Sequence, residues 1–183
     1  TGIELENSDG RHNIGNISIS SHQNDDVFRG RFNSSFANGS FKGTAPLAEF
    51  VRDLLGITLK KETPSLFRDA SYEWKGNSYD LSFYFQNTRD ILSFVLPGMY
   101  IADKTGLSLK IDGSGNMDAD IISQRIAYRE NFAKDLSVHL DNRSEILKAR
   151  LETDDASLAG IKLENGVMKL SGDNDLVDFT FLF

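Results

Sequence analysis

The stretch from Asp112 to Asp118, DGSGNMD, contains the residue types in this 183-residue sequence that come nearest to a metal-binding loop. It places oxygen-bearing side chains at alternate positions, and oxygen is the ligand that Ca²⁺ prefers. The helix–loop–helix calcium motif also requires Gly at its sixth position and Glu at its twelfth, where this sequence has Met117 and Ser123. Gly113 and Gly115 begin a G-x-G pattern, but no third glycine follows at the spacing of a dinucleotide site. We therefore predict a hairpin turn here.

The other candidate groups for catalysis are scattered along the chain. No two of the three histidines have the spacing of metal ligands, and His139 stands between Val138 and Leu140, so we expect its side chain to point toward solvent. Adjacent acids at 25–26 and 154–155 lie among turn residues, and adjacency alone does not bring two carboxylates to one bond. No serine lies in a G-x-S-x-G motif. The sequence predicts no catalytic residue, no metal site and no cofactor, and we expect a protein that is not an enzyme.

Composition narrows the possible partners. The net charge is −7, which argues against binding the phosphate backbone of a nucleic acid. There is no cysteine, so disulfides and thiolate chemistry are excluded. The 13 phenylalanines carry large apolar side chains with no polar atom, and they predict either a large core or a substantial apolar surface.

The elements that would position these residues are mostly short strands. NISIS (16–20), VFRGRFNSSF (27–36) and GSFKGT (39–44) alternate apolar and polar residues. Asn38-Gly39 predicts a hairpin, because both residues tolerate positive φ. A second turn is predicted at 75–77, followed by a strand in which Tyr79, Leu81, Phe83 and Phe85 share one face.

Two amphipathic helices are predicted, at about 46–55 and within 87–98. For the first, Thr44 is the expected cap, Pro46 suits the first turn and Gly56 is the expected stop. Its predicted apolar stripe consists of Leu47, Phe50, Val51, Leu54 and Leu55. The second helix ends at Pro97-Gly98.

From residue 99 to 183, strands recur about every ten residues and are separated by Asp, Asn, Gly and Ser, which is typical of an antiparallel meander. The sequence predicts a mainly β fold in one domain, 1–183. Within it, 1–86 holds strands and the first helix, 87–98 the second helix and 99–183 the meander.

The segment LSFVLPGMYIADKTGLSLKIDGSGNMDADI (92–121) resembles the TamB/AsmA-like proteins of Gram-negative envelopes, especially the TamB-like chains of the Bacteroides type. The Leu-x-Leu strands of 132–172, separated by Asn, Asp and Gly, resemble the repetitive strands of the same family. The resemblance is one of pattern and carries no catalytic motif.

The resemblance implies a periplasmic segment of an inner-membrane-anchored protein, with a sheet that curls into an open trough (a β-taco). It implies phospholipid transport between the two membranes, outer-membrane assembly, or both. The implied partners are phospholipid acyl chains, an outer-membrane barrel protein of the assembly-factor type and adjacent segments of the same chain. The alternating residues that would line the trough are Leu81, Phe83, Phe85, Leu107, Leu109, Ile111, Leu136, Val138, Leu140, Leu147, Leu151, Val177, Phe179 and Phe181.

Three alternatives stay open. The same residues would form an ordinary closed core if both helices cover the sheet. A non-enzymatic scaffold would instead pair with other proteins through exposed strand edges, and a small-ligand barrel or an enzyme on a β scaffold would require a closed sheet. Alternating apolar residues at both ends, Ile3 and Leu5 at one and Val177 to Phe183 at the other, lead us to expect a piece of a longer chain.

Overall fold

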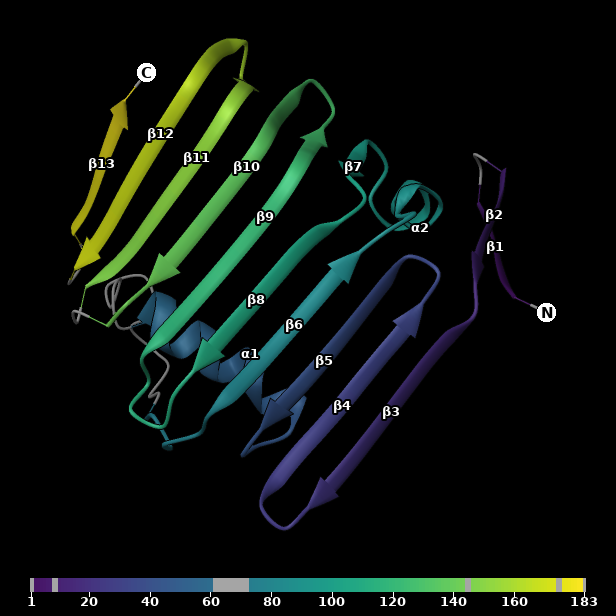
Figure 1. The fold of residues 1–183 in the computed structure, drawn as a ribbon, viewed down its shortest axis with the longest axis vertical. Coiled ribbons are helices and arrows are strands. Elements are labelled where there is room, and N and C mark those ends of the chain that lie inside the picture. Colours follow the sequence, from purple (N-terminus) through teal and green to yellow (C-terminus); the bar gives the residue numbers. More distant parts are fainter. Residues whose placement is uncertain (1, 8–9, 61–72, 144–145, 174–175, 183) are drawn as a thin grey trace.

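A long antiparallel sheet dominates the computed structural model, which describes residues 2–7, 10–60, 73–143, 146–173 and 176–182. Ten of its eleven strands are hydrogen-bonded in the order β13-β12-β11-β10-β9-β8-β6-β5-β4-β3 (Figure 1). These strands are β3 (Ile17–Asn24), β4 (Val27–Ser34), β5 (Ala37–Gly43), β6 (Tyr79–Phe85), β8 (Thr105–Ile111), β9 (Met117–Tyr128), β10 (Asn131–Asp141), β11 (Leu147–Leu158), β12 (Ile161–Asp173) and β13 (Leu176–Leu182). The eleventh strand, β7 (Met99–Ile101), pairs with one end of β9.

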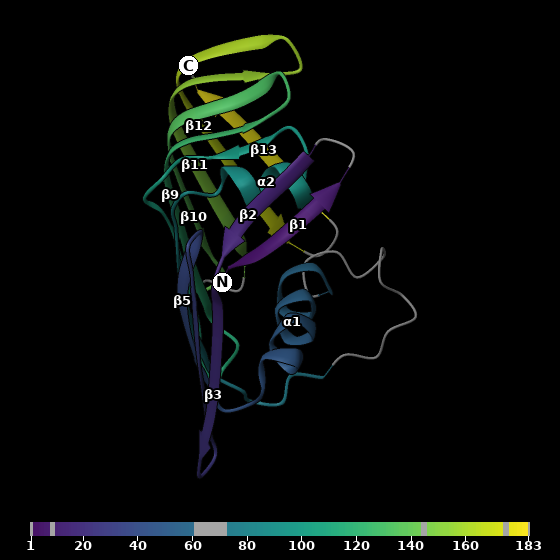
Figure 2. The same ribbon diagram turned by 90° about the vertical axis from the view of Figure 1, so that its right-hand side faces the viewer.

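The remaining elements lie on one side of this sheet (Figure 2). They are a separate hairpin of β1 (Ile3–Asn7) and β2 (Gly10–Gly15), and the helices α1 (Leu47–Leu55) and α2 (Arg89–Val95). A single π-helical turn, η1 (Gly56–Lys60), continues α1. The predictions of a mainly β fold, an antiparallel meander and two short helices are confirmed. The described strands form an open sheet with edges at β3 and β13, and not the closed barrel of the third alternative.

The sheet has two chemically different faces, because paired residues on neighbouring strands share a face and successive residues alternate. We call the side that carries α1 the inner face and the opposite side the outer face. One row of paired residues crosses the inner face through all ten strands, and we call it the apolar row. It consists of Ile19, Phe32, Gly39, Phe83, Leu107, Ile121, Val138, Leu151, Met168 and Phe181.

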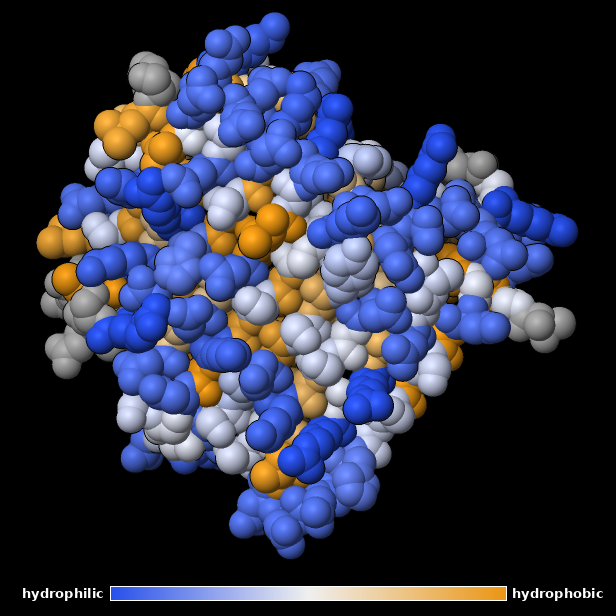
Figure 3. All heavy atoms as spheres, in the orientation of Figure 1, coloured by the Kyte–Doolittle hydropathy of each residue, from blue (hydrophilic) through white to orange (hydrophobic). Residues whose placement is uncertain are grey.

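The neighbouring row on the outer face is polar in every strand. It consists of Ser20, Arg31, Ser40, Ser82, Ser108, Asp120, His139, Arg150, Lys169 and Thr180. Figure 3 looks onto the outer face and shows mainly hydrophilic side chains, with hydrophobic atoms visible between them. A sheet with one wet face and one dry face explains the alternation in the sequence.

The core lies where α1 covers β5, β6, β8 and β9. Phe50 of α1 meets Tyr79 edge-on, with ring centroids 5.3 Å apart, and Phe41 at 6.2 Å. Both strand residues are buried, together with Met117 and Ile111. Most of the buried apolar contact therefore concerns the middle of the sheet.

The apolar stripe predicted for α1 is wrong in part. Phe50 is buried and Leu54 is partly buried, but Leu47, Val51 and Leu55 are 52%, 54% and 51% exposed. These three are spaced four residues apart, so they lie along the side of the helix that does not pack on the sheet.

The predicted ends of α1 are also wrong. The cap residue is Pro46, without a side-chain hydrogen bond, and Thr44 instead accepts a hydrogen bond from the Ser78 amide. Gly56 does not stop the helix, because its backbone is helical and continues into η1.

The hairpin predicted at Asn38-Gly39 is wrong. Both residues lie inside β5, and the turn precedes them at Ser35. A Cβ atom on Gly39 would lie 2.5 Å from the ring of Phe83 on the neighbouring strand. The glycine makes room for this cross-strand ring, and its conformational freedom in a turn is not used.

Two further turn predictions have different outcomes. The turn between β8 and β9 is confirmed: the Asp112 carboxylate accepts hydrogen bonds from the Asn116 side chain and from the backbone of Ser114 and Asn116. The hydrogen bond from the Asn116 side-chain amide is the main cause that lowers the pKa of the Asp112 carboxyl group. The hairpin predicted at 75–77 is wrong, because the described residues before β6, 73–78, contain no strand.

Candidate functional site

The inner face is the candidate site, because strand register gathers on it apolar residues from ten strands. All fourteen residues predicted to line a trough lie on this face: Leu81, Phe83, Phe85, Leu107, Leu109, Ile111, Leu136, Val138, Leu140, Leu147, Leu151, Val177, Phe179 and Phe181. At about 4.8 Å between strands, the apolar row runs for about 43 Å.

Burial divides these fourteen residues into two groups. Leu81, Leu109 and Ile111 are buried in the cluster that contains Phe50 of α1, so they serve as ordinary core. Phe179 and Phe181, by contrast, are 58% and 52% exposed on the edge strand β13. The alternative of an ordinary closed core therefore holds beneath α1, whereas the inner face of the C-terminal strands is more exposed.

Several inner-face residues escaped the sequence analysis. Ile121 is adjacent to Ile122, so alternation alone does not tell which of them faces inward. Met168 is likewise adjacent to Val167, and Ile19 belongs to β3, which has only two apolar residues. Their pairing with Leu151 and Phe32 places them in the apolar row, and that information comes only from register.

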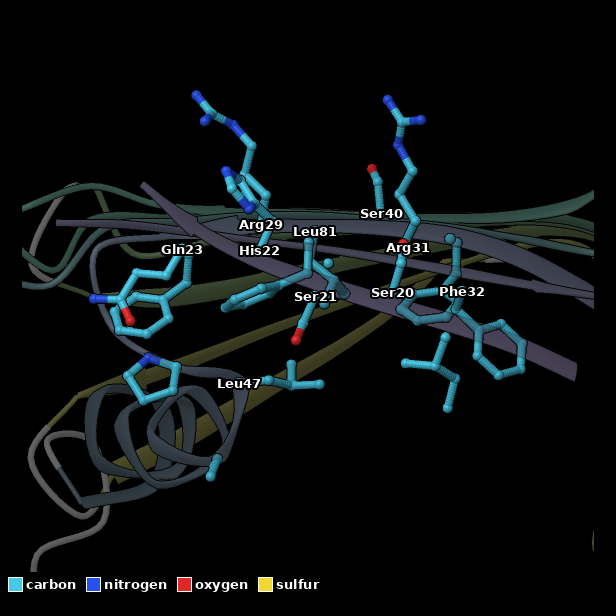
Figure 4. A pocket seen from close by; sticks show the side chains of 18 residues that line it. Ser20, Ser21, His22, Gln23, Arg29, Arg31, Phe32, Ser40, Leu47 and Leu81 are labelled. Carbon is cyan, nitrogen blue, oxygen red and sulfur yellow. The ribbon is translucent and has the colours of Figure 1, made fainter. Parts of the chain in front are cut away.

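A first hollow, which we call the N-terminal hollow, lies between the start of α1 and β3–β6. Its volume is about 580 Å³, within the range of small-molecule sites. Phe28, Phe32, Phe83 and Leu47 are among its apolar lining residues. Figure 4 shows Phe32 and Leu47 on the helix side of the strands, while the Arg29 and Arg31 side chains point the opposite way.

A second hollow, the C-terminal hollow, has a volume of about 290 Å³ and lies over β9–β13. Leu136, Leu151, Met168 and Phe181 are among its lining residues. The two hollows lie on the inner face at either side of the part that packs against α1. The helix therefore divides the apolar face into two open parts.

The alternation of inward and outward residues shifts by one position in β11, where the strand lines the C-terminal hollow. Thr153 and Ala156 of β11 are both buried, although they are three residues apart instead of two. On the flanking strands, Asp135 and Asn165 have φ of 48° and 52°, a conformation that Asp and Asn adopt more readily than most residues. The turn predicted around the adjacent acids 154–155 is wrong, because β11 runs through both residues, and β9 to β12 are strands of 11 to 13 residues.

Buried threonine hydroxyl groups donate hydrogen bonds to backbone carbonyl oxygens in this part of the sheet. Thr105 Oγ1 lies 2.6 Å from Ser123 Oγ and donates to the carbonyl oxygen of Ala102. Thr153 Oγ1 donates to the carbonyl oxygen of Lys134 at 2.6 Å. Of these residues only Thr153 lines the C-terminal hollow, and its hydroxyl proton is directed to the backbone.

A polar contact fixes α1 on the sheet. The Asp53 side chain, fully buried, accepts hydrogen bonds from Tyr79 Oη at 2.6 Å and from Asn77 Nδ2 at 2.8 Å, and its other oxygen lies 3.7 Å from Arg52 Nη2. Burial is the main cause that raises the pKa of Tyr79, and the bond to Asp53 adds to it. The tyrosine therefore stays a neutral donor throughout the physiological range.

The outer face brings together one cluster of titratable residues that the sequence analysis missed. Asp118, Asp120 and His139 have ligand atoms within 4.8 Å of one another, because β9 and β10 pair in this register. His139 Nδ1 lies 2.8 Å from Asp120, and Asp118 pairs with Arg143. Each acid thus has a cationic or imidazole partner of its own, which is the arrangement of a surface ion-pair network.

The Asp120 contact raises the pKa of His139 above its usual value of about 6.5. Because the folded pKa is the higher one, the stabilisation is complete below about pH 6.5 and is lost as the pH rises through the folded pKa. We expect His139→Gln to lower the free energy of unfolding more at pH 5.5 than at pH 9, by under about 1 kcal/mol at this partly exposed site. Urea unfolding at the two pH values measures this. In an Asp120→Asn background we expect the pH-dependent difference to shrink, because Asp120 is the main cause of the raised pKa; an undiminished difference would assign the effect to another group.

Comparisons with protein-family models, with curated proteins and with solved structures found no match to this chain. Within the described residues, the helices are too short or too polar to cross a membrane.

Proposed function

We propose that this protein is a segment of a lipid-conducting trough of the TamB/AsmA-like kind, and that its inner face receives phospholipid acyl chains. The observation that carries the proposal is the apolar row, which crosses ten strands with only Gly39 interrupting its large apolar side chains. Each methylene removed from water against such a surface contributes about 0.8 kcal/mol. The two hollows are the places where chains would lie.

The chemistry of the lining supports acyl chains over a polar ligand. The residues around the C-terminal hollow present almost only apolar atoms, and the Thr153 hydroxyl among them is bonded to the backbone. A ligand recognised by its polar groups needs convergent donors or acceptors. The net charge of −7 also disfavours attachment through anionic headgroups, so the contact proposed is with the tails. A periplasmic location and an outer-membrane barrel partner follow only from the family resemblance.

A second candidate function is a scaffold that pairs through its open edges, and the exposure of β13 favours it. Leu176, Phe179, Phe181 and Leu182 are 72%, 58%, 52% and 52% exposed on this edge strand. An edge that leaves its backbone groups and apolar side chains open is a template for another strand. The two functions are compatible, since an added strand would lengthen the apolar face.

Site-specific photo-crosslinking tests the lipid proposal. We expect benzoylphenylalanine at Met168, which lines the C-terminal hollow, to capture lipid from phosphatidylethanolamine–phosphatidylglycerol vesicles. Mass spectrometry of the purified protein detects the adduct. The matched control is the same probe at Lys169, one residue along on the outer face, where we expect no adduct. Absence of lipid at position 168, or equal capture at both positions, would contradict the proposal.

A further inference from the structure

The two open edges of the sheet are complementary in direction. The ten strands from β3 to β13 are antiparallel at every step, and an even number of alternating strands makes the two edge strands antiparallel to each other. If β3 of a second copy lies beside β13, the new pair is antiparallel like all the others. An odd number of strands would have produced a parallel join instead.

The hydrogen-bond pattern is also continuous across such a join. In antiparallel sheets, paired residues alternate between hydrogen-bonded and non-hydrogen-bonded pairs, and each residue directs its backbone groups to only one neighbour. Along one row, the two kinds of pair therefore alternate from strand to strand. Nine strand pairings lie within the chain, so the first and the ninth residue pair along the row are of the same kind. A tenth pair, between Phe181 and Ile19 of another copy, is then of the other kind. The first pair within the next copy is again of the original kind, so the alternation continues.

Side chains match in this register on both faces. On the inner face Phe181 meets Ile19, which is 74% exposed on its own edge, and the apolar row becomes continuous. On the outer face Thr180 meets Ser20, and Asp178 meets His22, whose partner within the sheet is Arg29. A pair of like edges lacks this match of an acid with an imidazole, because Asp178 is the only acid of β13 and β3 has none.

We infer that β13 of one copy of this chain pairs with β3 of a second copy, head to tail and antiparallel, with Thr180 opposite Ser20. The inference rests on the second proposed function, pairing through an open edge, and adds the partner and the register. The partner surface is the same chain, so the contact is heterologous and lengthens the apolar face by one sheet per copy.

Disulfide trapping tests this directly, because the chain contains no cysteine. We expect Ser20→Cys and Thr180→Cys variants, mixed and oxidised, to give a disulfide heterodimer on a non-reducing gel. The two positions lie at opposite edges, about 43 Å apart within one sheet, so the bond forms only between copies. Both residues are exposed, and circular dichroism verifies that the variants fold.

Two controls fix the face and the register. Ser21→Cys lies one residue along β3 on the inner face, and Asn24→Cys lies four residues along on the outer face. We expect at least tenfold less heterodimer when either is mixed with the Thr180→Cys variant. Equal trapping at all three positions would reduce the contact to random collision and overturn the inference.

The remaining outcomes separate this inference from the proposals on which it builds. Dimers of the Thr180→Cys variant alone, without heterodimer, would show pairing of like edges and overturn the head-to-tail arrangement only. Monomers in every mixture, with a monomeric mass in sedimentation at the same concentration, would overturn pairing between copies. Lipid capture at Met168 is read independently of both results.

Discussion

Phe50→Ala lowers the free energy of unfolding by about 3–5 kcal/mol, the cost typical of removing a buried aromatic ring. Phe50 is 7% exposed and contacts Tyr79 and Phe41, so the variant leaves a cavity between α1 and the centre of the sheet. The released helix no longer buries Asp53 against Tyr79, which adds to the loss. Urea unfolding followed by circular dichroism measures the change.

Val51→Ala is the matched control, one residue along the same helix. Val51 is 54% exposed, and Ala has the better helix propensity, so we expect a change within about 0.5 kcal/mol. Equal losses in the two variants would mean that α1 does not pack through the Phe50 side, and the division of the inner face into two hollows would then be wrong.

Leu151→Glu weakens the binding of an acyl chain roughly 30-fold. Leu151 lines the C-terminal hollow and belongs to the apolar row, and a hydrated carboxylate there removes contact with two or three methylenes. At about 0.8 kcal/mol for each methylene the loss is about 2 kcal/mol, and every 1.4 kcal/mol is tenfold in affinity. Titration with a fluorescent C16 fatty acid measures it.

Lys148→Glu introduces the same side chain on the outer face of the same strand, where Lys148 is exposed. We expect its affinity for the fatty acid to stay within twofold of the parent protein. Circular dichroism and the unfolding midpoint establish that both variants are folded. A parent protein that binds no fatty acid, or two variants that lose affinity equally, would contradict the acyl-chain proposal.

The sequence predicts some elements well because their signals are local. Leu107, Leu109 and Ile111 alternate with polar residues, and the structure has β8 there with these side chains inward. The turn at Asp112–Asn116 was predictable for the same reason, since its hydrogen bonds join residues at most four apart. Alternation and turn chemistry act over a few residues and do not depend on the rest of the fold.

Predictions failed where a distant residue decides the conformation. Asn38-Gly39 has the chemistry of a turn, but the Phe83 ring on the next strand needs the space over Gly39. Asp154 and Asp155 suggest a turn, yet pairing with β10 on one side and β12 on the other carries β11 through them. The cluster of Asp118, Asp120 and His139 likewise depends on the register of two strands.

The sequence by itself determined that this chain forms an antiparallel sheet with one apolar face, one polar face and two short helices. Period-two alternation and helix periodicity are written in neighbouring residues, so no tertiary information is needed to read them. Only the tertiary structure decided which part of the apolar face is core and which part is open. That depends on where α1 lies, and Phe50 and Asp53 place it over the middle of the sheet by contacts with Tyr79, 26 or more residues away in sequence.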